Sequence, residues 1–261
     1  MKSFNALIVF ALVQPCVAFQ LQGGLPARRS HRQGRTQKVG PAFDGTSVPR
    51  VEIFSRNVAL RAKRSPTGDF ELQELKAQIE SLNRQRIPTS ALPPTKRFEL
   101  ESYVRAIIEN KASPVPLEQV GQKLRGTKWR LSFSSDNAAV SDLPRDATVL
   151  LNFVDDKNVD YCLRFGEKTA GLKSITAKST WTAGEGNNIS GNNPGLVSMV
   201  YDKISCDAFG LSNLGIGFFG LLKGRASYVQ TVYFDNDLWI DGGYASDGSA
   251  YFNVYTPDKT A

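Results

Sequence analysis

The sequence predicts a mainly β protein, an antiparallel up-and-down barrel of about eight strands that follows two or three short helices. Three observations carry this prediction. Up to residue 124, apolar residues recur at helical steps of three and four. From Gly126 onward they alternate with polar residues, in eight short stretches at hairpin spacing. Clusters of Gly, Asn and Asp separate these stretches, as turns separate the strands of a meander.

Two amphipathic helices are expected between residues 70 and 111. The first carries an apolar stripe of Phe70, Leu72, Leu75, Ile79 and Leu82. The Pro-rich segment 86–94 then interrupts the chain, and Thr95 is the expected N-cap of the second helix. That helix has its stripe at Leu100, Val104, Ile107, Ile108 and Lys111. A third, shorter piece carries Leu117, Val120 and Leu124.

The eight expected strands come after this helical lead. They occupy residues 129–133, 147–154, 159–165, 173–183, 196–207, 226–234, 237–241 and 249–256. In the first of them, Trp129, Leu131 and Phe133 alternate with polar neighbours, which predicts one buried and one wet face. We therefore expect a helical lead over residues 65–125 and a barrel over residues 126–261.

The net charge of +7 is concentrated at the N-terminus. Residues 1–64 hold 11 of the 32 Lys and Arg and two of the 25 Asp and Glu, which leaves 21 basic against 23 acidic residues in 65–261. The expected folded part is close to neutral and has no basic face to follow a phosphate backbone, so we expect no nucleic-acid partner.

Two targeting segments are expected ahead of the folded part. Lys2, an apolar run over residues 4–13 and the small residues of "CVAF" have the form of a signal peptide over residues 1–18. Residues 19–64 are rich in Arg, Gly, Ser and Gln and have no acid before Asp44, which is typical of a transit peptide. An aromatic residue, Phe19, after the cut resembles the bipartite leaders of algae with red-lineage secondary plastids. We expect a plastid protein; the alternative is a secreted protein with a basic linker.

Gly126-x-x-Trp129 at the start of an eight-stranded barrel resembles the lipocalins, whose tryptophan closes one end of a cup. The stretches "IIENKASPVPLEQVGQKLRGTKWRLSFSS" and "VYFDNDLWIDGGYASDGSAYFNVY" are more similar to the plastid lipid-associated proteins, or fibrillins. The family patterns are "NPxPxP", "LxGxWxLxYTS" and "YxDxDLRIxRG", and the resemblance covers about residues 98–256. It implies a lipocalin-like barrel that binds lipid or isoprenoid in plastids.

One family position departs from the pattern. Trp239 stands where the family has the arginine of "DLRI", and Asp241-Gly242-Gly243 stands where it has "RG". The departure puts an inherited polar site in doubt and indicates a more aromatic interior.

Most kinds of catalytic and metal site are excluded by composition. The only histidine, His31, lies in the leader, so Ser-His-Asp, Cys-His and histidine-bearing zinc sites are not expected. Cys162 and Cys206 allow at most one disulfide. Carboxylates remain, and we interpret Asp155, Asp156, Asp235, Asp237, Asp241 and Asp247 as solvated turn residues. Asp235 and Asp237 match family positions, where turn capping is the expected role. We expect no cofactor and no metal.

Two apolar features remain for function. The stretch "GLSNLGIGFFGLLKG" (210–224) is either a plug under the barrel or a lip that contacts a membrane through Phe218, Phe219 and Leu222. The aromatic set within the strands either fills the core or forms an apolar cup for a pigment, quinone or fatty chain. The expected ligand-binding residues are Trp129, Leu131, Phe133, Tyr161, Trp181, Tyr201, Tyr228 and Trp239.

The sequence thus predicts a non-catalytic plastid protein that binds lipid or isoprenoid at thylakoids or plastoglobules. The first alternative is a structural coat or assembly factor without a ligand, and the second is a lipocalin-like isomerase that uses a buried Asp or Tyr. An interior below about 300 Å³ would favour the coat. A carboxylate that faces an enclosed apolar cavity would favour the enzyme.

Overall fold

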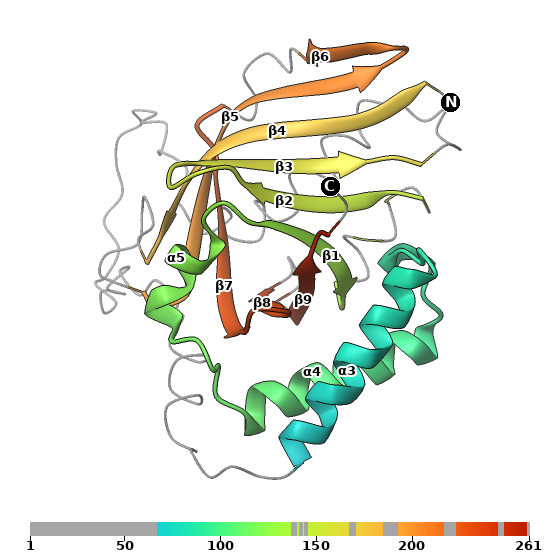
Figure 1. Cartoon of the computed structure of the whole chain (residues 1–261), viewed down its shortest axis with the longest axis vertical. Coiled ribbons are helices and arrows are strands. Elements are labelled where there is room, and N and C mark those ends of the chain that lie inside the picture. Colours follow the sequence, from blue (N-terminus) through green and yellow to red (C-terminus); the bar gives the residue numbers. More distant parts are fainter. Residues whose placement is uncertain are drawn as a thin grey trace, which may run out of the picture.

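A computed structural model describes residues 67–136, 140, 143, 146–166, 171–184, 193–216, 223–244 and 248–259. The expected signal and transit peptides therefore lie outside the described residues. Two long helices pack along one side of a curved antiparallel sheet (Figure 1). None of the helices in the described part of the chain combines the length and the apolarity that crossing a bilayer requires.

The helical lead begins with α3 (Thr67–Arg84), followed by the 3-10 helix η1 (Thr89–Ala91) and α4 (Pro94–Asn110). A second 3-10 helix, η2 (Leu117–Gln119), leads into the short α5 (Val120–Leu124). The predicted apolar stripes are buried at all their central positions, but Phe70 at the start of α3 is exposed. The predicted N-cap Thr95 is wrong, because α4 begins one residue earlier at Pro94, whose fixed φ suits the first helical position.

Nine strands follow in the described residues. They are β1 (Lys128–Ser134), β2 (Thr148–Phe153), β3 (Asn158–Arg164), β4 (Leu172–Ala183), β5 (Leu196–Ala208), β6 (Leu211–Gly215), β7 (Ala226–Phe234), β8 (Trp239–Tyr244) and β9 (Ala250–Pro257). All pairings are antiparallel, in the order β4-β3-β2-β1-β9-β8-β7-β5-β6. An additional pairing of β4 with β5 closes the ring, so the predicted antiparallel barrel is confirmed.

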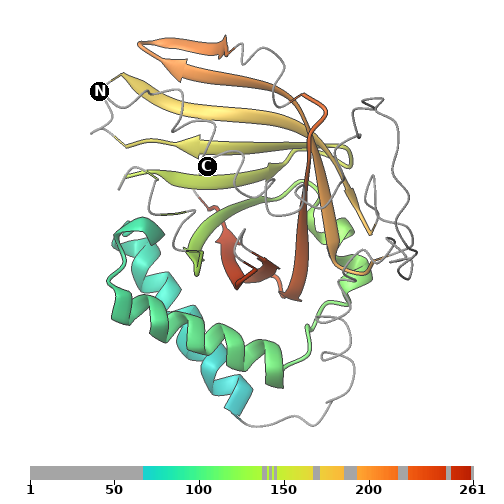
Figure 2. The ribbon, with the colours of Figure 1, turned by 180° about the vertical axis from the view of Figure 1, so that it is seen from behind.

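β6 is the strand that the sequence does not predict. Its residues fall in the glycine-rich stretch expected to be a loop, and they pair only with the outer half of β5. The inner half of β5, from Leu196 to Val200, pairs with β7 instead. β6 therefore extends the sheet beyond the ring, on the side of the barrel away from α3 and α4 (Figures 1 and 2).

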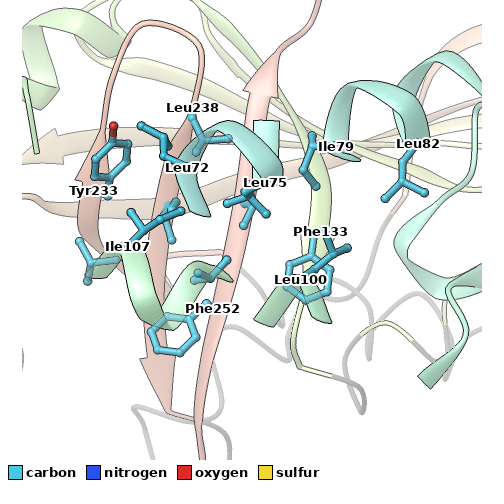
Figure 3. Close-up of a cluster of buried hydrophobic side chains, with 14 of the residues drawn as sticks. Leu72, Leu75, Ile79, Leu82, Leu100, Ile107, Phe133, Tyr233, Leu238 and Phe252 are labelled. Atoms are coloured by element: carbon cyan, nitrogen blue, oxygen red, sulfur yellow. The ribbon is translucent and has the colours of Figure 1, made fainter. Parts of the chain in front are cut away.

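The helical lead and the barrel share one hydrophobic core. Leu75 and Ile79 of α3 and Leu100 and Ile107 of α4 pack against outward-facing side chains of β1, β7, β8 and β9 (Figure 3). A salt bridge of 2.8 Å from Lys76 Nζ to Asp235 Oδ2 ties α3 to the turn between β7 and β8. The helices thus cover the outer face of four strands, and the barrel interior forms a separate space behind them.

Candidate functional site

An aromatic cluster closes one end of the barrel interior. The Trp129 ring lies 5.3 Å from the Phe234 ring and 5.9 Å from the Trp239 ring, between centroids. Phe153 continues the cluster to Trp181, at a centroid distance of 4.8 Å. Side chains of α5 pack into the same cluster, so the predicted burial of Trp129 against residues of the last strands is confirmed.

Each indole N–H in this cluster has a hydrogen-bond acceptor. Trp129 Nε1 donates to Thr127 Oγ1 at 2.8 Å, and Trp239 Nε1 donates to Thr231 Oγ1 at 3.1 Å. Trp181 Nε1 donates to the Asp155 carbonyl at 3.0 Å. Trp129, Trp181 and Trp239 were expected to bind a ligand. They lie instead in this aromatic cluster, and none of them is among the described residues that line the cavity of the barrel.

A cavity of about 70 Å³ lies inside the barrel, next to this cluster. Leu131, Tyr161, Tyr201 and Tyr228 line it, as expected for ligand-binding positions. Tyr255 belongs both to the lining and to the aromatic cluster, where its ring stacks on Trp239 at 4.7 Å. The volume is well below the roughly 300 Å³ at which ordinary ligand pockets begin. It holds about five water-sized groups, at roughly 10–15 Å³ for each.

Phe133 does not line the cavity. The pairing of β1 with β9 shifts by one residue between Leu131 and Phe133, so the alternation of faces is inverted after Leu131. Ser134 then faces the cavity, whereas Phe133 packs under the helices beside Leu100 (Figure 3). The residue expected as a ligand contact is a core residue of the helix–barrel interface.

Asp241 lies in the wall of the cavity, and its interpretation as a solvated turn residue is wrong. It sits within β8, paired with Thr231 of β7 and Asn253 of β9, and only 2% of its surface is exposed. Period-two alternation from the inward-facing Trp239 could have located it, because residues two apart on a strand share a face. The sequence interpretation placed it at the last position of the expected strand 237–241 but still counted it among the solvated carboxylates.

The Asp241 carboxyl is only partly satisfied. Oδ1 accepts a hydrogen bond of 2.8 Å from Asn253 Nδ2, whereas Oδ2 has no hydrogen-bond partner of standard geometry among the described residues. Burial raises the pKa of Asp241 to about 7, against the lowering effects of Asn253 and the nearby Tyr255 hydroxyl. The same burial, with the Asp241 charge next to it, raises the pKa of Tyr255 well above its usual value.

The polar part of the lining is acidic and aromatic. Asp136 is a second carboxyl in the lining, and Tyr251 joins the four tyrosines already named. Ser227, which is 1% exposed, also lines the cavity, and its Oγ has no hydrogen-bond partner among the described residues. No Lys, Arg or His stands among the described lining residues. The cavity therefore combines two carboxyl groups, tyrosine rings and two polar atoms that have no hydrogen-bond partner of standard geometry among the described residues.

Two other carboxylates have the turn role that the sequence predicts. Asp155 Oδ1 accepts the backbone N–H groups of Lys157 and Asn158 at 2.8 and 2.7 Å. Asp235 Oδ1 accepts those of Asp237 and Leu238 at 2.8 and 2.7 Å. Among the described residues, no group of three or more His, Cys, Asp and Glu side chains is arranged to hold a metal ion. Cys162 and Cys206 are free thiols.

A second candidate site is the hairpin formed by β5 and β6. Phe209 and Gly210 form its two-residue turn with φ of 54° and 81°, as the tight hairpin turns of twisted strands require. The Phe209 ring lies against Gly171, where a Cβ would come within 2.3 Å of it. Even so, 80% of Phe209 is exposed, with 59% of Leu211 and 38% of Leu214 on β6. The predicted membrane contacts Phe218, Phe219 and Leu222 lie outside the described residues.

In the comparisons with known proteins, no family model matches the chain, and neither curated proteins nor solved structures contain a match.

Proposed function

We propose that this chain is a non-catalytic protein of plastid lipid surfaces, peripheral to thylakoids or plastoglobules, that attaches through the β5–β6 hairpin. The plastid assignment rests on the composition of residues 1–64 and on the resemblance to the fibrillins. The proposed attachment is supported by one observation. Phe209, Leu211 and Leu214 are exposed apolar side chains on the side of the barrel away from the helices.

The hairpin has the energetics of a reversible membrane anchor. A fully exposed apolar side chain that leaves water contributes about 2 kcal/mol, so Phe209, Leu211 and Leu214, at 80%, 59% and 38% exposure, contribute about 3–4 kcal/mol together before the ordering cost. The sequence that follows β6 adds Phe218, Phe219 and Leu222 within the same apolar stretch. A tight turn holds Phe209 at the tip, which reduces the entropy that attachment would cost.

The attachment is expected to be mainly hydrophobic. Residues 65–261 carry 21 basic and 23 acidic residues, so this part of the chain has no excess of positive charge for anionic lipids. A polybasic patch would contribute about 1 kcal/mol for each basic residue near the surface and would be screened by salt. We therefore expect salt to release little of the bound protein.

The small cavity favours a surface role over a carrier role. A volume of about 70 Å³ does not accommodate a whole pigment or quinone unless the barrel opens. The proposal therefore assigns lipid contact to the outside of the molecule, as in a coat or assembly factor. In this proposal, lipid is bound at the surface of the hairpin and is not enclosed in the barrel.

Flotation of the purified protein with galactolipid vesicles tests the proposal. The wild-type protein should float with the vesicles at low and at high salt. Phe209→Ser combined with Leu211→Ser should abolish flotation and leave the melting transition nearly unchanged, because both side chains are exposed. Phe218→Ser with Phe219→Ser tests the rest of the stretch in the same way.

Phe98→Ser is the matched control. Phe98 on α4 is 74% exposed but belongs to the helix pair on the other side of the barrel, so its loss should leave flotation intact. Equal loss with both variants would mean nonspecific adhesion and would contradict the proposal. A wild-type protein that stays in solution and elutes as a dimer through the hairpin would make the hairpin an interface between two copies.

A second candidate is a proton-transfer enzyme, which Asp241 favours. A carboxyl with a pKa of about 7 in a cavity is suited to general acid–base chemistry near neutral pH. Exchange of the α-protons of a small ketone with D2O, followed by NMR, tests this candidate. Exchange at the buffer rate with both the wild type and Asp241→Asn would exclude it for that class of substrate.

A further inference from the structure

We propose that the cavity inside the barrel is a binding site for a small organic cation, an ammonium group held by Asp241 and surrounded by tyrosine rings. This inference is independent of the proposed membrane attachment, because it concerns the interior of the barrel and not its surface.

The proposed site centres on one oxygen of a buried carboxyl, that of Asp241. Asp241 lines the cavity and is 2% exposed, and its Oδ2 has no hydrogen-bond partner of standard geometry among the described residues, with the Tyr255 hydroxyl close by. A buried polar atom without a partner costs free energy, so its retention in a wall with space in front of it indicates a ligand atom. Ser227 Oγ is a second such atom in the same wall.

The charged groups in the lining favour a cation as the ligand. Asp136 and Asp241 both line the cavity, and no Lys, Arg or His stands among its described lining residues. A buried carboxylate without a cation partner is costly, and for Asp241 no cation partner stands among the described lining residues. A cationic ligand would supply it, whereas an anionic ligand would be repelled.

The tyrosine rings in the lining favour an ammonium group in particular. Tyr161, Tyr201, Tyr228, Tyr251 and Tyr255 contribute rings to a small cavity, and ring faces attract ammonium groups. An anion would be repelled by the carboxyls, whereas a plain alkyl group would pack on the rings but leave the Asp241 carboxylate without a cation. The cavity of about 70 Å³ accepts a compact head such as a trimethylammonium or alkylammonium group, but not a large amine.

Calorimetric titration with choline tests the proposal, and 3,3-dimethyl-1-butanol is the matched control. The alcohol has the shape of choline, with carbon in place of the charged nitrogen. Choline should bind at least about tenfold more tightly, which corresponds to about 1.4 kcal/mol. Equal affinity for the two compounds would overturn the proposal, and so would an absence of choline binding at millimolar concentration.

The pH dependence identifies the group that holds the cation. The carboxylate form of Asp241 binds the cation, so affinity should fall by about tenfold from pH 8 to pH 6 as a group with a pKa near 7 becomes protonated. The other titratable groups in the lining are Asp136 and the tyrosines. Asp241→Asn should lose this pH dependence and about tenfold or more of the affinity at pH 8. Unchanged affinity in this variant would overturn the proposal.

Two variants at Tyr228 distinguish the contribution of its aromatic ring to choline binding from an effect on the stability of the fold. Tyr228→Phe keeps an aromatic face and should keep most of the affinity, whereas Tyr228→Leu should weaken binding severalfold with a similar melting temperature. Equal binding by the two variants would contradict the aromatic part of the site.

The ammonium group has two possible sources, a free amine or a lipid headgroup. Vesicles of phosphatidylcholine should compete with choline only if a headgroup reaches the site, and galactolipid vesicles, which carry no ammonium group, serve as the control. Either result with phosphatidylcholine supports the ammonium site and identifies its source. Competition by galactolipid vesicles alone would contradict the site, while flotation on those vesicles reports on the hairpin.

Discussion

At the scale of the residue, Asp241 shows how burial changes the titration of a single carboxyl group. Its carboxyl is held by Asn253 on one oxygen and by nothing of standard geometry among the described residues on the other. Burial therefore raises its pKa to about 7, so that the folded protein binds a proton that the unfolded chain releases near pH 4. Stability and the proposed cation binding are then linked to the same titration.

The sign of the effect on stability follows from this linkage. The folded-state pKa is raised, so the contribution of Asp241 to stability is fully present below pH 4 and is lost as pH rises toward 7. From pH 5.5 to pH 8 the free energy of unfolding should fall by about 2 kcal/mol on account of this group. Urea melts at the two pH values measure the change.

Asp241→Asn is the matched variant for this prediction. It keeps the shape of the side chain and removes the titration, so the difference in stability between pH 5.5 and pH 8 should shrink by the same amount. A wild type and a variant with parallel pH profiles would mean that the carboxyl is hydrated and titrates normally.

Trp129 provides a second prediction at the residue scale. It is buried against Phe234 and Trp239, and its indole N–H is satisfied by Thr127. Trp129→Ala should lower the free energy of unfolding by about 3–5 kcal/mol, as truncation of large buried aromatics does. A cost below about 1 kcal/mol in denaturant melts would contradict its burial at the closed end. Phe98→Ala, on an exposed position, is the control.

At the scale of the element, an irregularity in β1 assigns neighbouring side chains to different compartments. The register shift between Leu131 and Phe133 leaves Leu131 in the cavity wall and turns Phe133 outward under the helices. A regular strand would have brought both side chains to one face. The bulge therefore allows one short strand to serve the interior and the helix interface.

This assignment predicts a contrast between two variants of β1. Phe133→Ala should destabilise the protein by about 3–5 kcal/mol, because it leaves a hole in the helix–barrel core, but it should leave choline affinity unchanged. Leu131→Ala should enlarge the cavity and change the affinity for choline. Denaturant melts and calorimetry measure both quantities, and a loss of affinity in Phe133→Ala with a stable fold would contradict the assignment.

At the scale of the whole molecule, α3 and α4 are part of the folded unit. Their buried residues form one core with Phe133, Tyr233, Leu238 and Phe252 of the barrel. With the helices on one side and the β5–β6 hairpin on the other, the barrel presents different surfaces in opposite directions (Figures 1 and 2). This difference between the two sides suits the proposed role, in which the protein contacts a lipid surface through the side that carries the hairpin.

Targeting is a prediction for the whole chain. Residues 1–60 fused to a fluorescent protein should reach the plastid, and Phe19→Ala should divert the fusion to the endoplasmic reticulum or the periplastid compartment. The physical reason is that translocation past the outer membranes depends on the segment exposed after the signal peptide is cut. Fluorescence microscopy in an alga with a secondary plastid measures it. Normal plastid import of the Phe19→Ala fusion would contradict the bipartite leader.

The kind and order of the elements other than β6 follow from the amino-acid sequence, because each of them depends on a local period. Helical stripes such as Leu72, Leu75 and Ile79 and alternating strands such as that around Trp129 are buried largely as their spacing predicts. The turn role of Asp155 and Asp235 was also predictable, since a carboxylate accepts backbone N–H groups a few residues away.

Which residues meet across the barrel depends on strand pairing and on closure of the ring. All residues of β6 are exposed, and their sequence has no apolar alternation. β6 is defined by its pairing with β5, so a local period in the sequence does not predict it. The shift in β1 depends on its partner β9, and it moves Phe133 out of the interior. The partly unsatisfied state of Asp241 depends on what three strands place around it, because burial and hydrogen bonding are properties of the closed ring and not of any segment of the chain.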